Sequence, residues 1–294
     1  MKKHDAPSAN ITAPRFAIGP RASVAAVVVV GFFLSACASS KTAEKILEPD
    51  PPGKMYALAD GYMTAGRFQK AAKKFEDLDR DHPYAPEARR AMVMAAYAYM
   101  SAKKYPEAIS TARRYTTMHP GTKDAPLAHH IIATSYFTSI NGPNRDQTAT
   151  RKALKEYRIL KTRYPDSKWA RNADNRIRIA EDSLAAQEMN VGRYYLKRNN
   201  HVAAINRFKT VVSDYQTTKH VEEALMRLTE SYMALGIRDE AQTAVAILGH
   251  NFPNSPWYAD AYALLQSDGL APRNVGGSWL SRTFASFKMP RIFN

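Results

Sequence analysis

The sequence predicts an all-α fold, a right-handed solenoid of five helix pairs followed by a capping helix. Three observations predict it. Near-identical joints recur along the chain, as in "YPDSKWA" from Tyr164 and "FPNSPWYA" from Phe252. Four tyrosines each stand at the same distance before such a joint. A small residue lies nine positions after each of these tyrosines.

The spacing of these positions identifies the repeat. Tyr62 precedes Pro83 by 21 residues, and Ala71 lies between them. This order of aromatic, small residue and proline is typical of a tetratricopeptide unit, two antiparallel helices in about 34 residues. The small residue lets the two helices approach closely. The other three matches are Tyr99, Ala108 and Pro120; Tyr195, Ala204 and Gln216; and Tyr232, Ala241 and Pro253.

Each joint is expected to end one helix and begin the next. Proline cannot continue a helix, because it lacks an N–H group and its ring clashes with the preceding turn. Ser167, Thr218 and Ser255 are placed to accept hydrogen bonds from the free N–H groups of the following helix. Pro86 and Pro126 suit a first helical turn.

The third unit carries an insertion. Tyr136, Ala153 and Pro165 keep the order of the repeat, but 17 residues instead of nine separate Tyr136 from Ala153. The extra residues fall in the loop sequence "NGPNRDQT". No proline or glycine interrupts residues 168–191, so we expect one extended helix there, joining the third pair to the fourth. The segment "SPWYADAYALLQS" is expected to be the capping helix.

The first 36 residues are expected to be a secretory signal. Four bases and one acid precede an apolar run of about fifteen residues, which is shorter than the roughly 20 that a membrane span needs. The sequence "LSAC", ending at Cys37, resembles the bacterial lipobox, whose cysteine becomes the lipidated first residue of the mature protein. Cys37 is the only cysteine in the chain. The alternative is a free cysteine at the end of an uncleaved anchor. Because Ala38 is not aspartate, the resemblance implies the outer membrane.

Four segments follow from these features: a signal peptide (1–36), a lipidated tether (37–54), the solenoid (55–268) and a basic aromatic tail (269–294). The tail has four bases and no acid. It is either an amphipathic segment that lies on a membrane or in a partner's groove, or a disordered end. We expect disorder.

The charge balance points to acidic partners or an anionic surface. The formal charge is +15, and about +12 stays on the chain once the signal is removed. Nucleic acid is not expected as a partner, because the protein is exported and its basic residues do not form runs. The sequence contains no G-x-S-x-G nucleophile elbow, no H-E-x-x-H zinc-binding helix and no glycine-rich phosphate-binding loop. We therefore expect no enzyme activity, no cofactor and no metal. The adjacent pair His129 and His130 points in different directions on a helix and cannot chelate one metal.

The first helix of each unit is expected to line a concave surface. In the first three units this surface carries aromatic and methionine side chains, which adapt to varied apolar peptides. In the last two units it carries charges, which favour a fixed partner. The alternative for each residue is a place in the core between units. The candidate client groove is Tyr56, Met63, Tyr97, Met100, His130 and Phe137. The candidate partner face is Met189, Arg193, Lys197, Met226 and Glu230.

The chain as a whole resembles the BamD (ComL) family of β-barrel assembly lipoproteins. The resemblance rests on the lipobox, the five units, the insertion "PNRDQTATRKAL" and above all "VGRYYLKRNNHVAAINRF". It runs from about Ala36 to Ser267, so the tail lies outside it.

The resemblance implies a lipid-anchored protein on the periplasmic face of the outer membrane. The half up to about residue 167 would bind unfolded outer-membrane protein precursors. The half after it would dock on the POTRA region of BamA, and other BAM lipoproteins would be further partners. One alternative is a different tetratricopeptide lipoprotein, such as a pilus-secretin pilotin. Another is a peptidoglycan-active or wall-associated protein.

Overall fold

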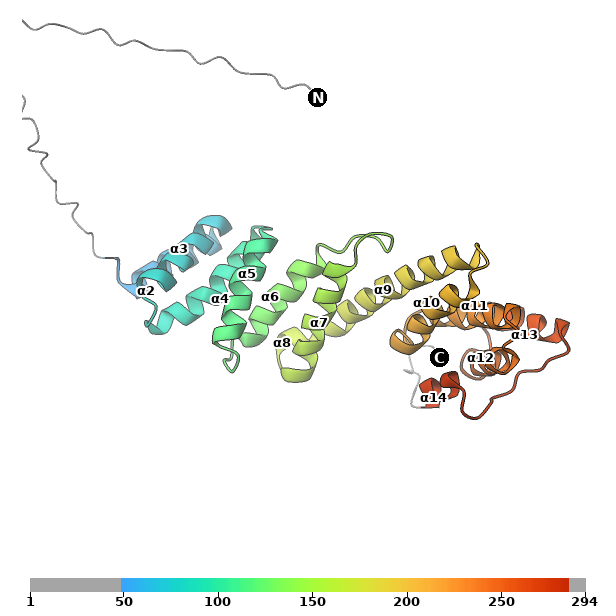
Figure 1. Ribbon diagram of the computed structural model, residues 1–294. Coiled ribbons are helices and arrows are strands. Elements are labelled where there is room, and N and C mark those ends of the chain that lie inside the picture. The colour runs from blue at the N-terminus through green and yellow to red at the C-terminus, as the bar shows by residue number, and fades with distance from the viewer. Residues whose placement is uncertain (1–48, 286–294) are drawn as a thin grey trace, which may run out of the picture. The chain divides into compact units, whose positions relative to one another are not determined.

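The computed structural model describes residues 49–285, and within this range every regular element is a helix (Figure 1). The signal peptide, Cys37 and most of the tether lie outside the described residues. The helices are α2 (Pro52–Thr64), α3 (Phe68–Asp81), α4 (Pro86–Ser101), α5 (Tyr105–Met118), α6 (Ala125–Phe137), α7 (Thr148–Arg163), α8 (Lys168–Arg171), α9 (Ala173–Leu196), α10 (His201–Asp214), α11 (Val221–Ala234), α12 (Arg238–Asn251), α13 (Pro256–Ser267) and α14 (Trp279–Ala285).

The helices form the five predicted pairs. These are α2 with α3, α4 with α5, α6 with α7, α9 with α10, and α11 with α12, and α13 packs on the last pair. Most helices pack mainly against their neighbours in the chain, as in a solenoid. The small residues Ala71, Ala108, Ala204 and Ala241 are completely buried where the paired helices meet. The predicted fold of helix pairs with a capping helix is confirmed.

The recurring joint has one backbone geometry. The residue after each second helix has a φ between −132° and −136° and a ψ between 38° and 58°, which lie outside the helical range, and the helix ends there. Its N–H still donates to the carbonyl four residues earlier, at 2.8 to 3.1 Å. In four of the five joints the next residue is a proline, which cannot continue the helix. These residues are His82, His119, Tyr164, Tyr215 and Phe252.

The predicted helix starts are confirmed in part. Ser167 Oγ accepts a hydrogen bond from the N–H of Ala170 at 3.1 Å, as expected of a capping residue. Thr218 differs, because its hydroxyl donates to the carbonyl of Tyr215 at 2.8 Å. Ser255 makes no side-chain cap. Pro86 begins α4, and Pro126 lies in the first turn of α6.

The long helix expected from residue 168 is present, but it begins later, as α9 at Ala173, and runs to Leu196. The short helix α8 precedes it, and the two are separated at Asn172, which has φ −93° and ψ 0°. The break lets Trp169 pack against α6, while Ala170 and Ala173 on either side are buried. Apolar packing of this short segment therefore overrides a sequence that contains no helix breaker.

The inserted loop of the third unit is tied down at its end. Gln147 is fully buried, and its side-chain N–H₂ group donates to the carbonyls of Gly142 (3.1 Å) and Arg145 (3.0 Å). Asn190 on α9 donates to the side chain of Asn144 at 2.7 Å. The extra residues are thus fastened to the start of α7 and to the middle of α9.

Both predicted ends of the solenoid need correction. Helix α2 begins at Pro52, so the last residues assigned to the tether, 52–54, are helical. The prediction of a disordered tail is wrong for residues 269–285. These residues run back past α12 and end in α14, whose Leu280 is fully buried (Figure 1). Residues 286–294 lie outside the described residues.

Candidate functional site

The first two units place the candidate client residues half in the core and half at the surface. Tyr56 lies edge-on to the ring of Phe75, with 5.3 Å between ring centroids. Met63 packs against the same apolar cluster of α2, α3 and α4. Tyr97 and Met100 pack against the next cluster, which α4, α5 and α6 form. All four keep partial exposure, so the core and groove interpretations both describe part of each side chain.

His130 and Phe137 belong to an aromatic and cationic cluster. The His130 ring stacks on Trp169, with 4.3 Å between centroids and 24° between planes. The Arg176 guanidinium lies 4.5 Å from the centre of the Phe137 ring, and Phe137 meets Tyr157 edge-on at 6.0 Å. Burial, with a smaller contribution from the charge of Arg176, lowers the pKa of His130 to about 4. His130 is therefore neutral at pH 7, and its partly exposed ring adds no charge to this surface.

The six candidate client residues thus form three successive groups, one on each of α2, α4 and α6. Sequence reasoning missed Trp169 and Arg176. Trp169 stands inside the joint "YPDSKWA", where the pattern indicates only a helix boundary. Arg176 faces Phe137 only because the chain turns at Asn172.

The prediction that Met189 lies on the candidate partner face is wrong. It is completely buried in the largest apolar cluster and cannot contact a partner. Met226 is half-buried against the same cluster, whereas Lys197 is exposed at the end of α9. The long, flexible methionine fills space between the helices, because position 189 faces α10 and not solvent.

The charges of this face are paired with one another. Arg193 Nη1 lies 2.7 Å from Glu223 Oε2, and its Nη2 donates to Asn190 at 2.6 Å. Arg227 then joins Glu223 (3.6 Å) to Glu230 (2.9 Å). The result is a chain of ion pairs along α9 and α11, most of it partly buried. Sequence reasoning found two of its four charged members, Arg193 and Glu230.

The adjacent histidines have separate partners. His129 Nδ1 is hydrogen-bonded to Glu156 Oε2 at 2.8 Å, with both side chains about 9% exposed. Arg113 approaches Glu156 at 3.9 Å. His130 faces Trp169 instead. Within residues 49–285, we find no group of three or more histidine, cysteine, aspartate or glutamate side chains arranged to hold a metal ion.

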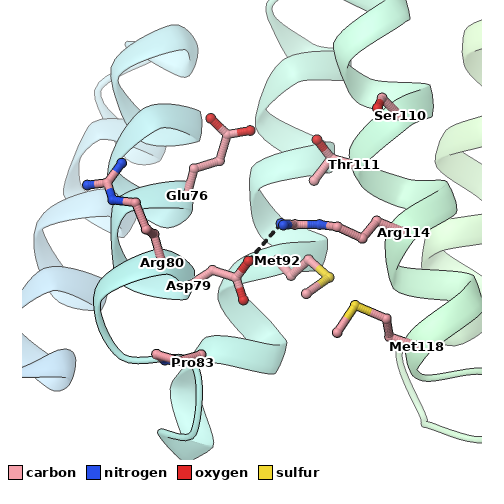
Figure 2. Close-up of a pocket in the computed structure, with 9 residues that line it drawn as sticks. All are labelled: Glu76, Asp79, Arg80, Pro83, Met92, Ser110, Thr111, Arg114 and Met118. Carbon is pink, nitrogen blue, oxygen red and sulfur yellow. Dashed lines mark hydrogen bonds and ion pairs between the residues drawn. The ribbon is translucent and has the colours of Figure 1, made fainter.

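A pocket of about 630 Å³ lies among α3, α4 and α5 (Figure 2). An ion pair between Arg114 and Asp79, at 2.7 Å, spans it. Figure 2 shows Met92 and Met118 on one side of this pair and Glu76 on the other. None of the six candidate client residues lines it. The further lining residues are Arg80, Pro83, Ser110 and Thr111.

None of the helices in the described part of the chain is both long enough and apolar enough to span a bilayer. The model of the YfiO family, described as outer membrane lipoprotein, matches residues 49–248. The chain belongs to the YfiO family. This match covers all five helix pairs except the last three residues of α12.

Individual relatives agree with the YfiO assignment. The chain is 38% identical to the outer membrane protein assembly factor BamD of Caulobacter vibrioides, over 86% of this chain and 83% of the relative. It is 36% identical to BamD of Rickettsia prowazekii, over 83% of this chain and 96% of the relative. The resemblance to the BamD family is confirmed. Among solved structures, the TPR2AB domain of yeast Sti1 is similar, with 15% identity, a TM-score of 0.36, and coverage of 74% of this chain and 84% of that one.

The YfiO match leaves the end of the chain unexplained. It stops within α12, before α13, the connecting segment and α14. The pocket among α3, α4 and α5, by contrast, lies wholly inside the YfiO region.

Proposed function

We propose that this chain is the periplasm-facing, lipid-anchored subunit of the β-barrel assembly machinery that binds unfolded outer-membrane protein precursors and docks on BamA. The observation that carries the proposal is the family match, which extends over the five helix pairs and leaves out only the ends. Relatives named outer membrane protein assembly factor BamD support it over most of their length. The mechanism is binding and handover, so the chain acts as a scaffold and not as an enzyme.

The first three units suit an apolar, extended client. Tyr56, Tyr97 and Phe137 each keep part of the ring exposed and hold the rest in the core. Rings anchored in this way lose little conformational freedom when a peptide binds. The neighbouring methionines, Met63 and Met100, adjust to side chains of different shape. Such a surface would hold a strand that ends in an aromatic residue at an affinity low enough for release.

The last two units suit a fixed partner. Lys197 is exposed beside the ion-pair chain that runs from Arg193 to Glu230. A partner that docks here must offer charges that complement pairs already formed, which gives specificity more than affinity. A POTRA domain of BamA is the partner that the family membership suggests for this face.

The membrane attachment is assigned to Cys37. Acyl chains on this residue would hold the body at the outer membrane, since each buried CH₂ contributes about 0.8 kcal/mol. Other BAM lipoproteins are proposed as further partners, and nucleic acid is not. Mass spectrometry of the mature N-terminus tests the anchor. A mature chain that begins at a residue other than Cys37, or carries no acyl group, would refute it.

Site-specific photo-crosslinking in cells tests the division of roles. A photo-reactive residue at position 97 should capture unfolded barrel precursors, and one at position 197 should capture BamA. Tyr84 and Tyr262, both exposed and outside the two surfaces, serve as matched control positions. Capture of the same single protein from positions 97 and 197, or equal capture at the controls, would contradict the proposal.

A further inference from the structure

The end of the chain is bound to the body of the protein as a ligand would be. Residues 270–285, which we call the strap, return along α12 after the capping helix (Figure 1). The side chain of Gln242 donates to the carbonyl of Ala271 at 2.7 Å. The N–H of Val275 donates to the hydroxyl of Thr243 at 3.2 Å. These hydrogen bonds hold the first part of the strap against α12, next to the groove that α14 fills.

Helix α14 occupies a groove among α10, α11 and α12. The indole N–H of Trp279 donates to the hydroxyl oxygen of Tyr232 at 2.9 Å. The ammonium of Lys209 lies 4.5 Å from the centre of the indole ring. Leu280 is completely buried in the apolar cluster, and Gln216 donates to the carbonyl of Thr283 at 3.4 Å. An aromatic anchor, a branched apolar side chain and a nearby charge hold the helix.

Because the units repeat, a groove equivalent to the one that holds α14 is expected earlier in the chain. Tyr62 and Tyr195 hold one repeat position, Tyr99 and Tyr232 hold the next, and both pairs are 133 residues apart. Helices α3, α4 and α5 are therefore equivalent to α10, α11 and α12. The residues beside the strap and α14 correspond to residues that line the open pocket of Figure 2. The pairs are Lys209 with Glu76, Gln216 with Pro83, Thr243 with Ser110, and Ile247 with Arg114.

We propose that the pocket among α3, α4 and α5 is a docking site for a short amphipathic helix of another protein, with an aromatic anchor and a basic side chain. The packing of α14 shows which kind of segment fits the equivalent groove among α10, α11 and α12. Met118, which is 58% exposed at the pocket wall, is the apolar surface that such a helix would cover. The site is separate from the candidate client groove and does not depend on the proposed function.

The charges of the pocket specify the basic side chain. Where the occupied groove has Lys209 beside the tryptophan, the open pocket has the carboxylate of Glu76. The hydroxyl of Tyr99 donates to Glu76 Oε2 at 2.7 Å, so its oxygen stays able to accept an indole N–H, as Tyr232 does. Asp79 is already paired with Arg114. Glu76 is therefore the carboxylate that an incoming cation would meet.

A labelled peptide tests the site directly. The probe is the α14 sequence SWLSRTFA, residues 278–285, held helical by a hydrocarbon staple, and its binding to the purified full chain is measured by fluorescence anisotropy. We expect saturable binding of one peptide per chain, because α14 already fills the equivalent groove. Met118→Gln should weaken binding about fivefold or more, and Glu76→Gln should weaken binding and reduce its salt dependence, because it removes the carboxylate without recreating the lysine of the occupied groove.

The matched control lies in the occupied groove. Lys209→Glu should leave peptide affinity unchanged if the peptide enters the open pocket. Loss of binding in Lys209→Glu with none in Met118→Gln or Glu76→Gln would show that the peptide displaces α14, and would overturn the proposal. Absence of saturable binding would do so too. A peptide with Thr283→Pro that binds equally well would show an extended ligand, which contradicts a helix. Circular dichroism confirms that each variant is folded.

Discussion

Gly192 lies where α9 packs directly against Phe208 of α10, and it offers a quantitative test of the packing. A methyl group added there would lie 2.4 Å from Cε1 of Phe208, 2.8 Å from Cζ and 2.9 Å from Cδ1. Carbon atoms in contact normally stand about 3.5–4.0 Å apart. Phe208 is completely buried, so its ring cannot swing aside. Helices α9 and α10 must therefore separate, or the ring must leave its preferred rotamer.

Two effects oppose each other in Gly192→Ala. Alanine favours a helix interior over glycine by about 1 kcal/mol. Overfilling a packed core costs about 1–3 kcal/mol. Because the contact would be more than 1 Å too short and the neighbour is fully enclosed, we place the cost near the upper end of that range. The expected result is a net loss of about 1–2 kcal/mol in the free energy of unfolding.

Urea unfolding followed by circular dichroism measures this loss, and a second glycine provides the control. Gly61 lies inside α2 with no atom within 4 Å of an added methyl group, so Gly61→Ala should raise stability by up to about 1 kcal/mol. Shortening the neighbour in Gly192→Ala/Phe208→Leu should recover part of what the single change loses. A Gly192→Ala protein as stable as Gly61→Ala would refute the packing argument.

Three further predictions concern polar contacts. Trp279→Phe removes the N–H donor to Tyr232 and should lower the free energy of unfolding by about 1 kcal/mol, measured in urea, whereas an unchanged value would show that α14 is not held by this bond. Glu156→Ala leaves His129 buried without its partner and should cost about 1–3 kcal/mol in the same assay, and a neutral effect would contradict a structural role for the pair. The folded protein disfavours protonation of His130, whose pKa is lowered from 6.5 to about 4. This shift should therefore leave the free energy of unfolding undiminished above pH 6.5 and should lower it as the pH falls from 6.5 towards 4. His130→Phe should reduce that loss. An NMR titration midpoint of His130 near pH 6.5 would contradict its burial.

The repeat could be read from the sequence because its key positions depend on local chemistry. Tyrosine, a small residue and proline at fixed spacing predict where helices meet and end. The buried Ala71 and Ala204 and the helix ends at His82 and Phe252 confirm this interpretation. The half-exposed state of Tyr97 also follows from the repeat position alone.

The rest depends on contacts between distant residues, which a periodic pattern does not contain. Met189 is predicted to lie on the partner face, yet it is buried in the apolar cluster that includes α10. The break at Asn172 arises because Trp169 packs on a helix that precedes it in the chain by some thirty residues. The tail has the composition of a disordered end, but residues 270–285 are held in the groove among α10, α11 and α12.

The strap also affects the order in which the parts of the protein fold. Most contacts join helices that are neighbours in the chain, so each pair can form from its own residues alone. The largest apolar cluster is the exception, because it includes Leu280, and the bond from Trp279 to Tyr232 spans 47 residues. That cluster cannot close until residues 279 and 280 have reached it, so it closes after the earlier pairs have formed. A chain truncated after α13 would therefore leave a strip of apolar surface open on its last two units, where quality-control proteases could recognise it.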